Sequence, residues 1–139
     1  MPDVQETIEL SVAPEVVWDI CGHPQSTPTW VPAVRQCRMK GDVRYSTLSD
    51  GSEAVERILL HSDQDRECEY ELVDPSPPIR SYWSRLTVEP LPTGTILRWC
   101  ARFETTNPED TEAIGASIRA TYRGGLETLA EQVDKMGHA

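Results

Sequence analysis

Hydrophobic and polar residues in the last quarter of the chain repeat with the period of an α-helix. Between residues 106 and 136, apolar or aromatic side chains recur every three or four residues, which places them on one face of a helix. The residues on this face are Ile114, Ile118, Tyr122, Leu126, Leu129 and Val133. Pro108 and the two acidic residues after it suit a first helical turn, where proline is tolerated and the helix dipole favours negative charge. We therefore predict one helix of about 28 residues, which would be about 42 Å long at 1.5 Å per residue.

Most of the chain before this helix alternates between polar and apolar residues, as β-strands do. Val4–Val12 is the first such segment, and a helix from Pro14 to Gly22 and a helical turn at Thr29–Val34 follow it. Six more strands are predicted at Gln36–Lys40, Val43–Leu48, Glu53–His61, Arg66–Val73, Ile79–Glu89 and Thr95–Glu104. Short turns join these strands, so we expect an antiparallel sheet. The predicted class is α+β, with about seven strands strongly curved around the C-terminal helix, and residues 1–139 are expected to form one domain.

The charge and composition of the chain exclude several kinds of partner. The formal net charge is -10 over 139 residues, whereas nucleic acids and anionic membrane surfaces attract clustered lysine and arginine. No apolar run approaches the roughly 20 residues that cross a bilayer, so we expect no membrane insertion. The first six residues have neither the basic start nor the apolar block of a signal peptide. We therefore expect a soluble, cytoplasmic protein that binds no nucleic acid.

The sequence contains no pattern that is typical of a metal or cofactor site. The four cysteines form no C-x-x-C pair, and no histidine lies at ligand spacing from them. The chain has neither a Walker loop nor a G-x-G-x-x-G motif for a nucleotide. We therefore expect no metal and no cofactor, and we expect the cysteines to stay reduced in the cytoplasm.

Several segments resemble one protein superfamily across nearly the whole chain. They are Ala13–Trp18, Trp30–Val34, Asp50–Leu59, Tyr70–Leu72, Ile79–Tyr82, Trp99–Phe103 and Tyr122–Leu126. These segments are similar to the START-like, or SRPBCC, superfamily, and in particular to its bacterial polyketide cyclase/dehydrase-like branch, which includes MxaD-like proteins. The resemblance implies the helix-grip fold, in which the sheet and the long helix enclose a cavity for an apolar or aromatic small molecule. Because the superfamily also contains lipid carriers, cyclases and hydrolase-like enzymes, the resemblance is specific for the fold rather than for the chemistry.

Three polar turns are expected at the same end of the sheet, because every second turn of an up-and-down sheet lies there. They are Ser49–Ser52, Asp74–Pro78 and Thr105–Pro108. In relatives with this fold, that end is the mouth of the pocket. The three prolines of the second turn restrict the backbone, so this turn suits a fixed rim better than a mobile lid.

Aromatic side chains are the first candidates for the wall of such a cavity. Strand alternation directs Tyr70, Tyr82, Trp99 and Phe103 inward. The stripe of the long helix adds Tyr122, and the short helical turn adds Trp30. Each one alone is compatible with ordinary core packing. Together they combine apolar rings with hydroxyl and indole N–H groups, which is typical of a pocket for an amphipathic ligand. Ser84 lies on the same face and could bond a ligand, and the helix segment from Ile118 to Leu126 is expected to complete the wall.

Glu56 and Arg57 are the candidates for acid–base chemistry in the middle of a strand. Adjacent strand residues point to opposite faces, so only one of them can enter the cavity. Glu56 would share its face with Ala54, Ile58 and Leu60, which is the more apolar side. A carboxyl group there would have a raised pKa and could act as an acid or a base. Arg57 could instead hold a carboxylate or an enolate, and a surface ion pair is the alternative for either residue.

Three functions remain open on this basis, and we rank binding first. The protein would hold a small hydrophobic or aromatic molecule between the sheet and the C-terminal helix. As an enzyme it would carry out aldol cyclisation or dehydration of a poly-β-keto compound, with Glu56, Tyr70 or Tyr82 moving a proton and Arg57 or a tyrosine holding the enolate. As an accessory protein it would bind no ligand and would have a filled interior. The sequence leaves open whether the chain is a monomer or a homodimer.

Overall fold

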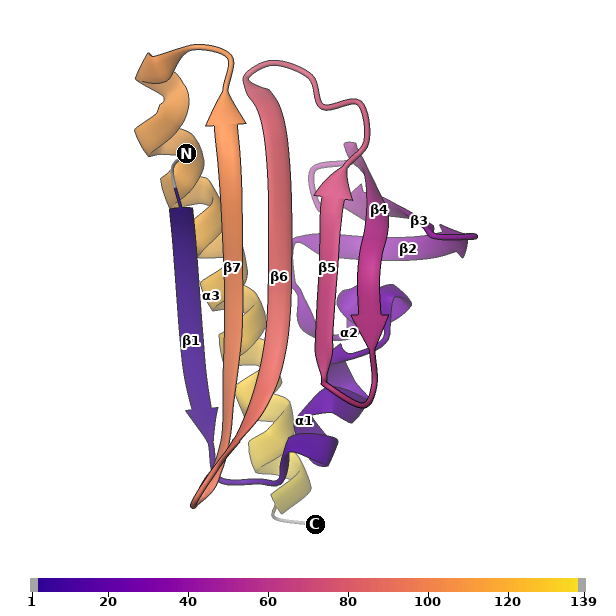
Figure 1. The fold of residues 1–139 in the computed structure, drawn as a ribbon, viewed down its shortest axis with the longest axis vertical. Coiled ribbons are helices and arrows are strands. Elements are labelled where there is room, and N and C mark those ends of the chain that lie inside the picture. The colour runs from indigo at the N-terminus through magenta and orange to yellow at the C-terminus, as the bar shows by residue number, and fades with distance from the viewer. Residues whose placement is uncertain (1–2, 138–139) are drawn as a thin grey trace.

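Seven β-strands form one antiparallel sheet that curves around the C-terminal helix (Figure 1). The computed structural model describes residues 3–137. The strands are β1 (Asp3–Leu10), β2 (Val34–Lys40), β3 (Val43–Leu48), β4 (Glu53–Ser62), β5 (Glu67–Leu72), β6 (Ile79–Leu91) and β7 (Gly94–Thr105). Their order in the sheet is β1-β7-β6-β5-β4-β3-β2, so consecutive strands are neighbours from β2 to β7, and β1 closes the far edge beside β7. The predicted α+β class and strand number are confirmed.

The helices match the prediction apart from some of their bounds. They are α1 (Pro14–Cys21), η1 (Pro24–Ser26), α2 (Thr27–Trp30), η2 (Pro108–Asp110) and α3 (Thr111–Gly137), where η marks a 3₁₀ segment. The helical turn predicted at Thr29–Val34 therefore begins earlier, and Val34 already belongs to β2. In the sequence, Pro24 and Pro28 suggest an interruption between two helices. In the structure, both prolines occupy the first turn of a helical segment, where a missing N–H is tolerated. The predicted first turn of the long helix is the 3₁₀ segment η2, and α3 follows with 27 residues.

Three irregularities in strand pairing bend the sheet. The register shifts between Val34 and Gln36 in β2, between Ile58 and Leu60 in β4, and between Ile79 and Ser81 in β6. An extra residue at such a bulge kinks the strand and increases its twist. In Figure 1, β2 and β3 consequently run across the direction of β1 and β7.

The bulge in β4 corrects one prediction about strand faces. Alternation places Leu60 on the same inner face as Ala54, Glu56 and Ile58. In the structure, Leu60 pairs with Glu69 and is 38% exposed. The extra residue at Leu59 reverses the alternation of side chains. The predicted inner face is therefore correct as far as Ile58, and Leu60 points to the outer face.

The helix α3 packs on the inner face of the sheet and contacts β1 and β7. Leu97 from β7 and Leu129 from α3 are both fully buried in this core. Phe103 is buried near Gly115 at the other end of the helix. An ion pair between Arg123 and Glu6 adds a polar contact between α3 and β1. The predicted apolar stripe is therefore the face by which the helix attaches to the sheet.

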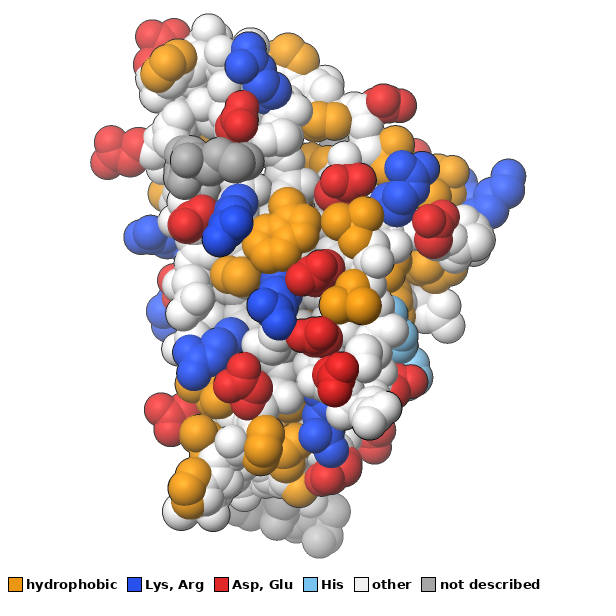
Figure 2. Space-filling view, in the orientation of Figure 1, with side chains coloured by type: hydrophobic (Ala, Val, Ile, Leu, Met, Phe, Trp, Pro, Cys, Tyr) orange, Lys and Arg blue, Asp and Glu red, His pale blue; other side chains and the backbone are white. Residues whose placement is uncertain are grey.

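The outer face of the sheet carries charges of both signs (Figure 2). Arg85 on β6 pairs with Glu67 at 2.6 Å and with Glu69 at 3.7 Å, both on β5. Such partly exposed pairs contribute little to stability. Among residues 3–137, no helix is both long enough and apolar enough to span a membrane.

Gly124 and Gly125 offer a matched test of how closely α3 packs. A methyl group on Gly124 would meet nothing within 4 Å, whereas one on Gly125 would lie 3.1 Å from Trp99 and 3.2 Å from Trp30. We expect Gly124→Ala to raise the free energy of unfolding by about 1 kcal/mol, because alanine favours the helix. Gly125→Ala has the same propensity but presses on two buried rings, so we expect a net decrease. Urea denaturation measures both changes, and equal stability of the two variants would contradict this packing.

Candidate functional site

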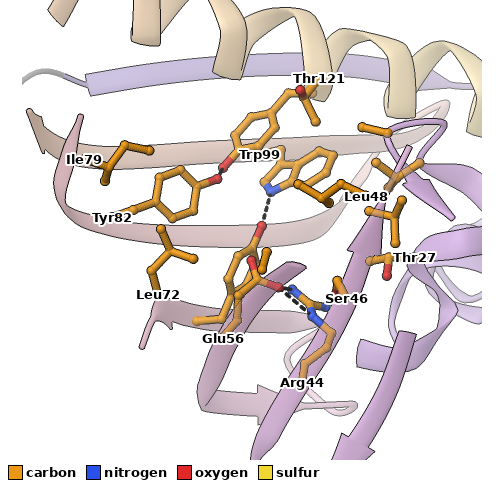
Figure 3. A pocket seen from close by; sticks show the side chains of 16 residues that line it. Thr27, Arg44, Ser46, Leu48, Glu56, Leu72, Ile79, Tyr82, Trp99 and Thr121 are labelled. Carbon is orange, nitrogen blue, oxygen red and sulfur yellow. Dashed lines mark hydrogen bonds and ion pairs between the residues drawn. The ribbon is translucent and has the colours of Figure 1, made fainter. Parts of the chain in front are cut away.

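A cavity of ≈ 200 Å³ lies between the inner face of the sheet and the helices α2 and α3 (Figure 3). Thr121 and Tyr122 line it from α3 and Thr27 from α2, and strands β2 to β7 contribute the remaining walls together with the segment between α2 and β2. Its apolar aliphatic side chains include Val31, Ala33, Val34, Leu48, Leu72 and Ile79. Leu48, Leu72 and Ile79 lie next to the β3–β4 and β5–β6 loops, at the end of the sheet expected to hold the mouth.

Trp99 stands at the centre of an aromatic wall. Its ring is nearly parallel to that of Tyr122, with 3.9 Å between the ring centroids and 5° between the planes. The Trp30 ring lies 5.1 Å from the Trp99 ring at 46°. These residues come from β7, α3 and α2, so the wall joins three separate elements. Ring pairs of this kind add stability beyond the area that they bury.

Ser84 connects this wall to the backbone of the sheet. Its hydroxyl donates to the Cys100 carbonyl oxygen at 3.0 Å and accepts from Trp99 Nε1 at 3.1 Å. Tyr122 Oη lies 2.8 Å from Ser84 Oγ and acts as the donor, because the single hydrogen of the serine hydroxyl is already used. The Tyr82 hydroxyl in turn donates to that of Tyr122. The hydroxyl hydrogens of Tyr82 and Tyr122 are therefore both occupied within the protein.

Tyr70 differs from the other two tyrosines because its hydroxyl hydrogen is free. Its oxygen accepts a hydrogen bond from Trp99 Nε1 at 3.2 Å, and it donates to no residue that the structure describes. The Arg44 guanidinium lies over its ring, 4.6 Å from the centroid. Burial, and then the nearby charge of Glu56, raise the pKa of Tyr70 above its ordinary value. Tyr70 therefore remains a neutral hydrogen-bond donor at physiological pH.

Arg44 and Glu56 form an ion pair at the side of the cavity (Figure 3). Arg44 Nε and Nη2 both lie 2.9 Å from the same oxygen of Glu56, Oε1. Arg44 Nη1 donates to the Pro24 carbonyl oxygen at 2.8 Å, which ties the pair to η1. Burial lowers the pKa of Arg44, but the charge of Glu56 and its hydrogen bond outweigh burial and raise it. The guanidinium therefore stays charged and remains paired with Glu56.

The structure separates Glu56 from Arg57, which the sequence left open. Glu56 lines the cavity, and its side chain is 13% exposed. Arg57 lies on the other face, is 45% exposed and pairs with Asp42 at 3.7 Å. Since Arg44 binds the carboxylate, Glu56 does not stand alone in apolar surroundings as the sequence prediction assumed.

The other predicted site residues fall into three groups. Tyr70, Tyr82, Trp99 and Tyr122 line the cavity. Trp30 and Ser84 are buried directly behind it, in contact with Trp99. Phe103, Ile118 and Leu126 point inward but belong to the packed core rather than to the cavity lining. The cavity wall on α3 is therefore shorter than the segment predicted from Ile118 to Leu126.

Arg44 is the main site residue that the sequence did not reveal. It shares its strand face with Ser46 and Leu48, a face without a clear apolar pattern. The hairpin turn at residues 49–52 contained a signal, because it sets β3 opposite β4 and thus Arg44 opposite Glu56. A register shifted by one residue would instead pair Arg44 with Arg57, and alternation alone does not choose between the two. Thr27 and Ser46 also add hydroxyl groups to the lining.

These groups define the chemistry available in the cavity. It has one arginine-bound carboxylate, one free phenolic donor, the hydroxyl groups of Thr27, Ser46 and Thr121, and otherwise mainly apolar side chains. Within residues 3–137, no group of three His, Cys, Asp or Glu side chains is arranged to hold a metal ion. The site is thus suited to orient a small molecule through a few polar contacts.

Removing the Glu56 carboxylate should destabilise the protein strongly. Glu56→Ala leaves the buried Arg44 charge without its partner, and we expect the free energy of unfolding to fall by roughly 3 kcal/mol. Glu67→Ala is the control, because Arg85 is 43% exposed and retains Glu69, and we expect a loss of less than about 1 kcal/mol. Urea denaturation near neutral pH measures both. Similar losses in the two variants would contradict the prediction, because they would show that an unpaired Arg44 is no more costly than an unpaired charge at the surface.

The three buried tyrosines should make the protein less stable at alkaline pH. Burial is the main cause that raises the pKa of Tyr70, Tyr82 and Tyr122 above the ordinary value of 10.0. As pH rises through 10, the unfolded state therefore loses these protons first. The free energy of unfolding should then fall by up to about 1.4 kcal/mol per pH unit for each tyrosine, whereas below that pH the tyrosines cause no change.

Denaturant titrations between about pH 8 and about pH 11 measure this slope on both sides of the ordinary tyrosine pKa. Buried Cys21 and Cys68 add to it from pH 9, because burial raises their pKa values from 9.0 to about 12 and about 11. Tyr82→Phe isolates one tyrosine contribution. Most tyrosinate absorbance should appear together with unfolding, and ionisation of these tyrosines in the folded protein would contradict the prediction.

Comparison with known proteins identifies the family of the chain. Residues 1–134 match the model of a family described as polyketide cyclase / dehydrase and lipid transport. No curated protein matches the chain.

Several solved structures share the fold over nearly the whole chain. XoxI from Bacillus cereus is 26% identical, with a TM-score of 0.90 and 100% of each chain covered. A START superfamily protein from Mycobacterium smegmatis is 16% identical, with a TM-score of 0.75 and coverage of 96% of this chain and 98% of that one. The Zhui aromatase/cyclase from Streptomyces sp. R1128 is 13% identical, with a TM-score of 0.81 and coverage of 96% and 94%. The last two show the fold alone. The chain therefore belongs to the polyketide cyclase/dehydrase and lipid transport family and has the helix-grip fold of the START-like superfamily.

Proposed function

We propose that the protein binds a small, largely apolar or aromatic molecule in the cavity between the sheet and α3. The observation that carries this proposal is an apolar-lined space of ≈ 200 Å³ that has a few polar groups at one side. An empty cavity of about 150 Å³ with an apolar lining is large enough to bind benzene. Pockets for drug-sized ligands typically span about 300–1,000 Å³, so this cavity suits a ligand of one or two rings.

An enzymatic function of the cyclase/dehydrase kind is the second candidate. The observation in its favour is that Glu56 and Tyr70, which could exchange protons with a substrate, line the same cavity. The family description and the aromatase/cyclase among the structural relatives agree with it. Arg57 is exposed, so the role of holding an enolate would fall to Tyr70. The cavity volume favours a small carbonyl compound over an extended polyketide chain, and we rank binding first because Arg44 already engages the carboxylate.

A ligand-free accessory role is the least favoured of the three functions. It would be supported by a fully packed interior, because such a role needs no internal space. The cavity volume argues against it. A natural ligand retained through purification would be detected by native mass spectrometry as additional mass on the chain.

Filling the cavity should abolish ligand binding without unfolding the protein. Ile79 lines the cavity beside the β5–β6 loop, and a larger ring there would occupy the space of the ligand. We expect Ile79→Trp to lose binding of ethylbenzene while it keeps wild-type stability or gains some, as cavity-filling substitutions do. Proton–nitrogen NMR detects binding through the indole N–H signal of Trp99.

Ile96→Trp is the matched control for this experiment. Ile96 is a residue of β7 that pairs with Glu9 of β1 and Glu89 of β6. Its side chain is on the strand face away from the cavity. This variant should bind ethylbenzene as the wild type does. Absence of any response in the wild-type spectrum at saturating ethylbenzene would contradict the proposed function, and binding by Ile79→Trp would move the site elsewhere.

A further inference from the structure

Glu56 has one carboxylate oxygen with unused hydrogen-bonding capacity. Arg44 Nε and Nη2 both contact Oε1, at 2.9 Å each. No residue from 3 to 137 donates a hydrogen bond to Oε2. The ion pair therefore presents an acceptor to whatever occupies the cavity.

Tyr70 has the complementary capacity. Its oxygen accepts the Trp99 N–H, while its own hydrogen is donated to none of the residues described. The residue is 6% exposed and lines the same cavity as Glu56. Tyr82 and Tyr122 cannot take this role, because their hydrogens are used in the chain that ends at Ser84. Tyr70 thus offers a donor and Glu56 an acceptor to a ligand, beside the hydroxyl group of Thr27, which also lines the cavity and has no partner among the residues described.

Strand pairing makes Glu56 and Tyr70 neighbours on the cavity face of the sheet. Glu56 pairs with Leu72 across β4 and β5, and Tyr70 lies two residues before Leu72 on the same strand face. Such diagonal neighbours are within reach of each other when the side chains are long. Arg44 links them further, since its guanidinium binds Glu56 and lies 4.6 Å from the centre of the Tyr70 ring.

The chemistry of these groups selects one kind of ligand substituent. A hydroxyl group can donate to Glu56 Oε2 and accept from Tyr70 at the same time. A carbonyl group can only accept and would leave Oε2 unpaired, and a carboxylate would be repelled by Glu56. An ammonium group can only donate, and the nearby Arg44 charge opposes it. Arg44 also compensates the charge of Glu56, so the site has little preference for a cation.

We propose that the cavity is specific for a neutral hydroxyl compound whose hydroxyl group bridges Glu56 and Tyr70 and whose apolar ring lies against Trp99. This inference rests on the proposed binding function and names its ligand class, a small phenol or ring-bearing alcohol. The cavity volume of ≈ 200 Å³ leaves room for about one substituted ring beyond the hydroxyl.

Three probes of nearly equal size test the role of the hydroxyl. These are 4-ethylphenol, 4-ethylanisole and ethylbenzene, of which only the first can donate and accept. We expect 4-ethylphenol to bind at least on the order of tenfold more tightly than either of the others, since hydrogen bonds to a charged group are the stronger kind. Proton–nitrogen NMR titrations of the full chain give the three dissociation constants.

Tyr70→Phe tests the donor without removing the ring. Arg44 keeps a ring to lie over, and Trp99 Nε1 keeps its bond to Ser84. We expect the preference for 4-ethylphenol over ethylbenzene to fall several-fold, roughly the effect of one hydrogen bond. Tyr45→Phe is the control, because Arg38 lies over its ring at 4.3 Å on the opposite face of the sheet. This variant should keep the full preference.

The possible results separate the two proposals. Equal affinities for 4-ethylphenol and ethylbenzene would overturn the hydroxyl site and leave the binding function intact. An unchanged preference in Tyr70→Phe would likewise overturn the assigned donor. If none of the three probes binds the wild type, both the binding function and the inference from it are wrong.

Discussion

The fold depends on one constraint, which is that a single helix has to cover a sheet wider than itself. α3 contacts the sheet through β1 and β7, where side chains such as Leu97 and Ala101 are almost completely buried. Beyond β6, the sheet bends at its bulges and curves toward α2 (Figure 1). A straight helix and a curved sheet diverge, and the cavity occupies the space between them. The cavity therefore follows from the architecture, even though interiors of proteins are otherwise closely packed.

The same divergence explains why the inner face changes character across the sheet. Under the helix, β7 presents Leu97, Ala101 and Phe103 to the core. Farther across, β3 and β4 present Arg44, Ser46 and Glu56, which face the cavity rather than packed side chains. Charged groups at these positions are acceptable because they pair with each other and with the Pro24 carbonyl oxygen. Charged groups are thus found where the helix does not reach.

The sequence predicted the elements better than the site. Alternation and turns located seven strands, and a stripe of period 3.6 located α3, because both patterns depend on local periodicity. The site depends on quantities that alternation does not contain. A one-residue change of register decides whether Arg44 faces Glu56 or Arg57, and a single bulge reverses the face of Leu60. Phe103 on β7 and Leu126 on α3 were correctly directed inward, but both lie in the packed core rather than in the cavity wall.

Trp99 shows how stability and ligand recognition are coupled in this arrangement. Its ring stacks on Tyr122, its edge meets Gly125 of α3, and its N–H is shared between Ser84 and Tyr70. One side chain thus attaches the helix, fixes the hydroxyl groups and forms the cavity wall. A ligand that binds only the folded state stabilises that state by an amount that grows with the logarithm of its concentration divided by its dissociation constant. A group with no hydrogen-bond partner inside the protein can change ligand recognition with less effect on folding. The hydroxyl hydrogen of Tyr70 is the foremost example, because it donates to none of the residues described.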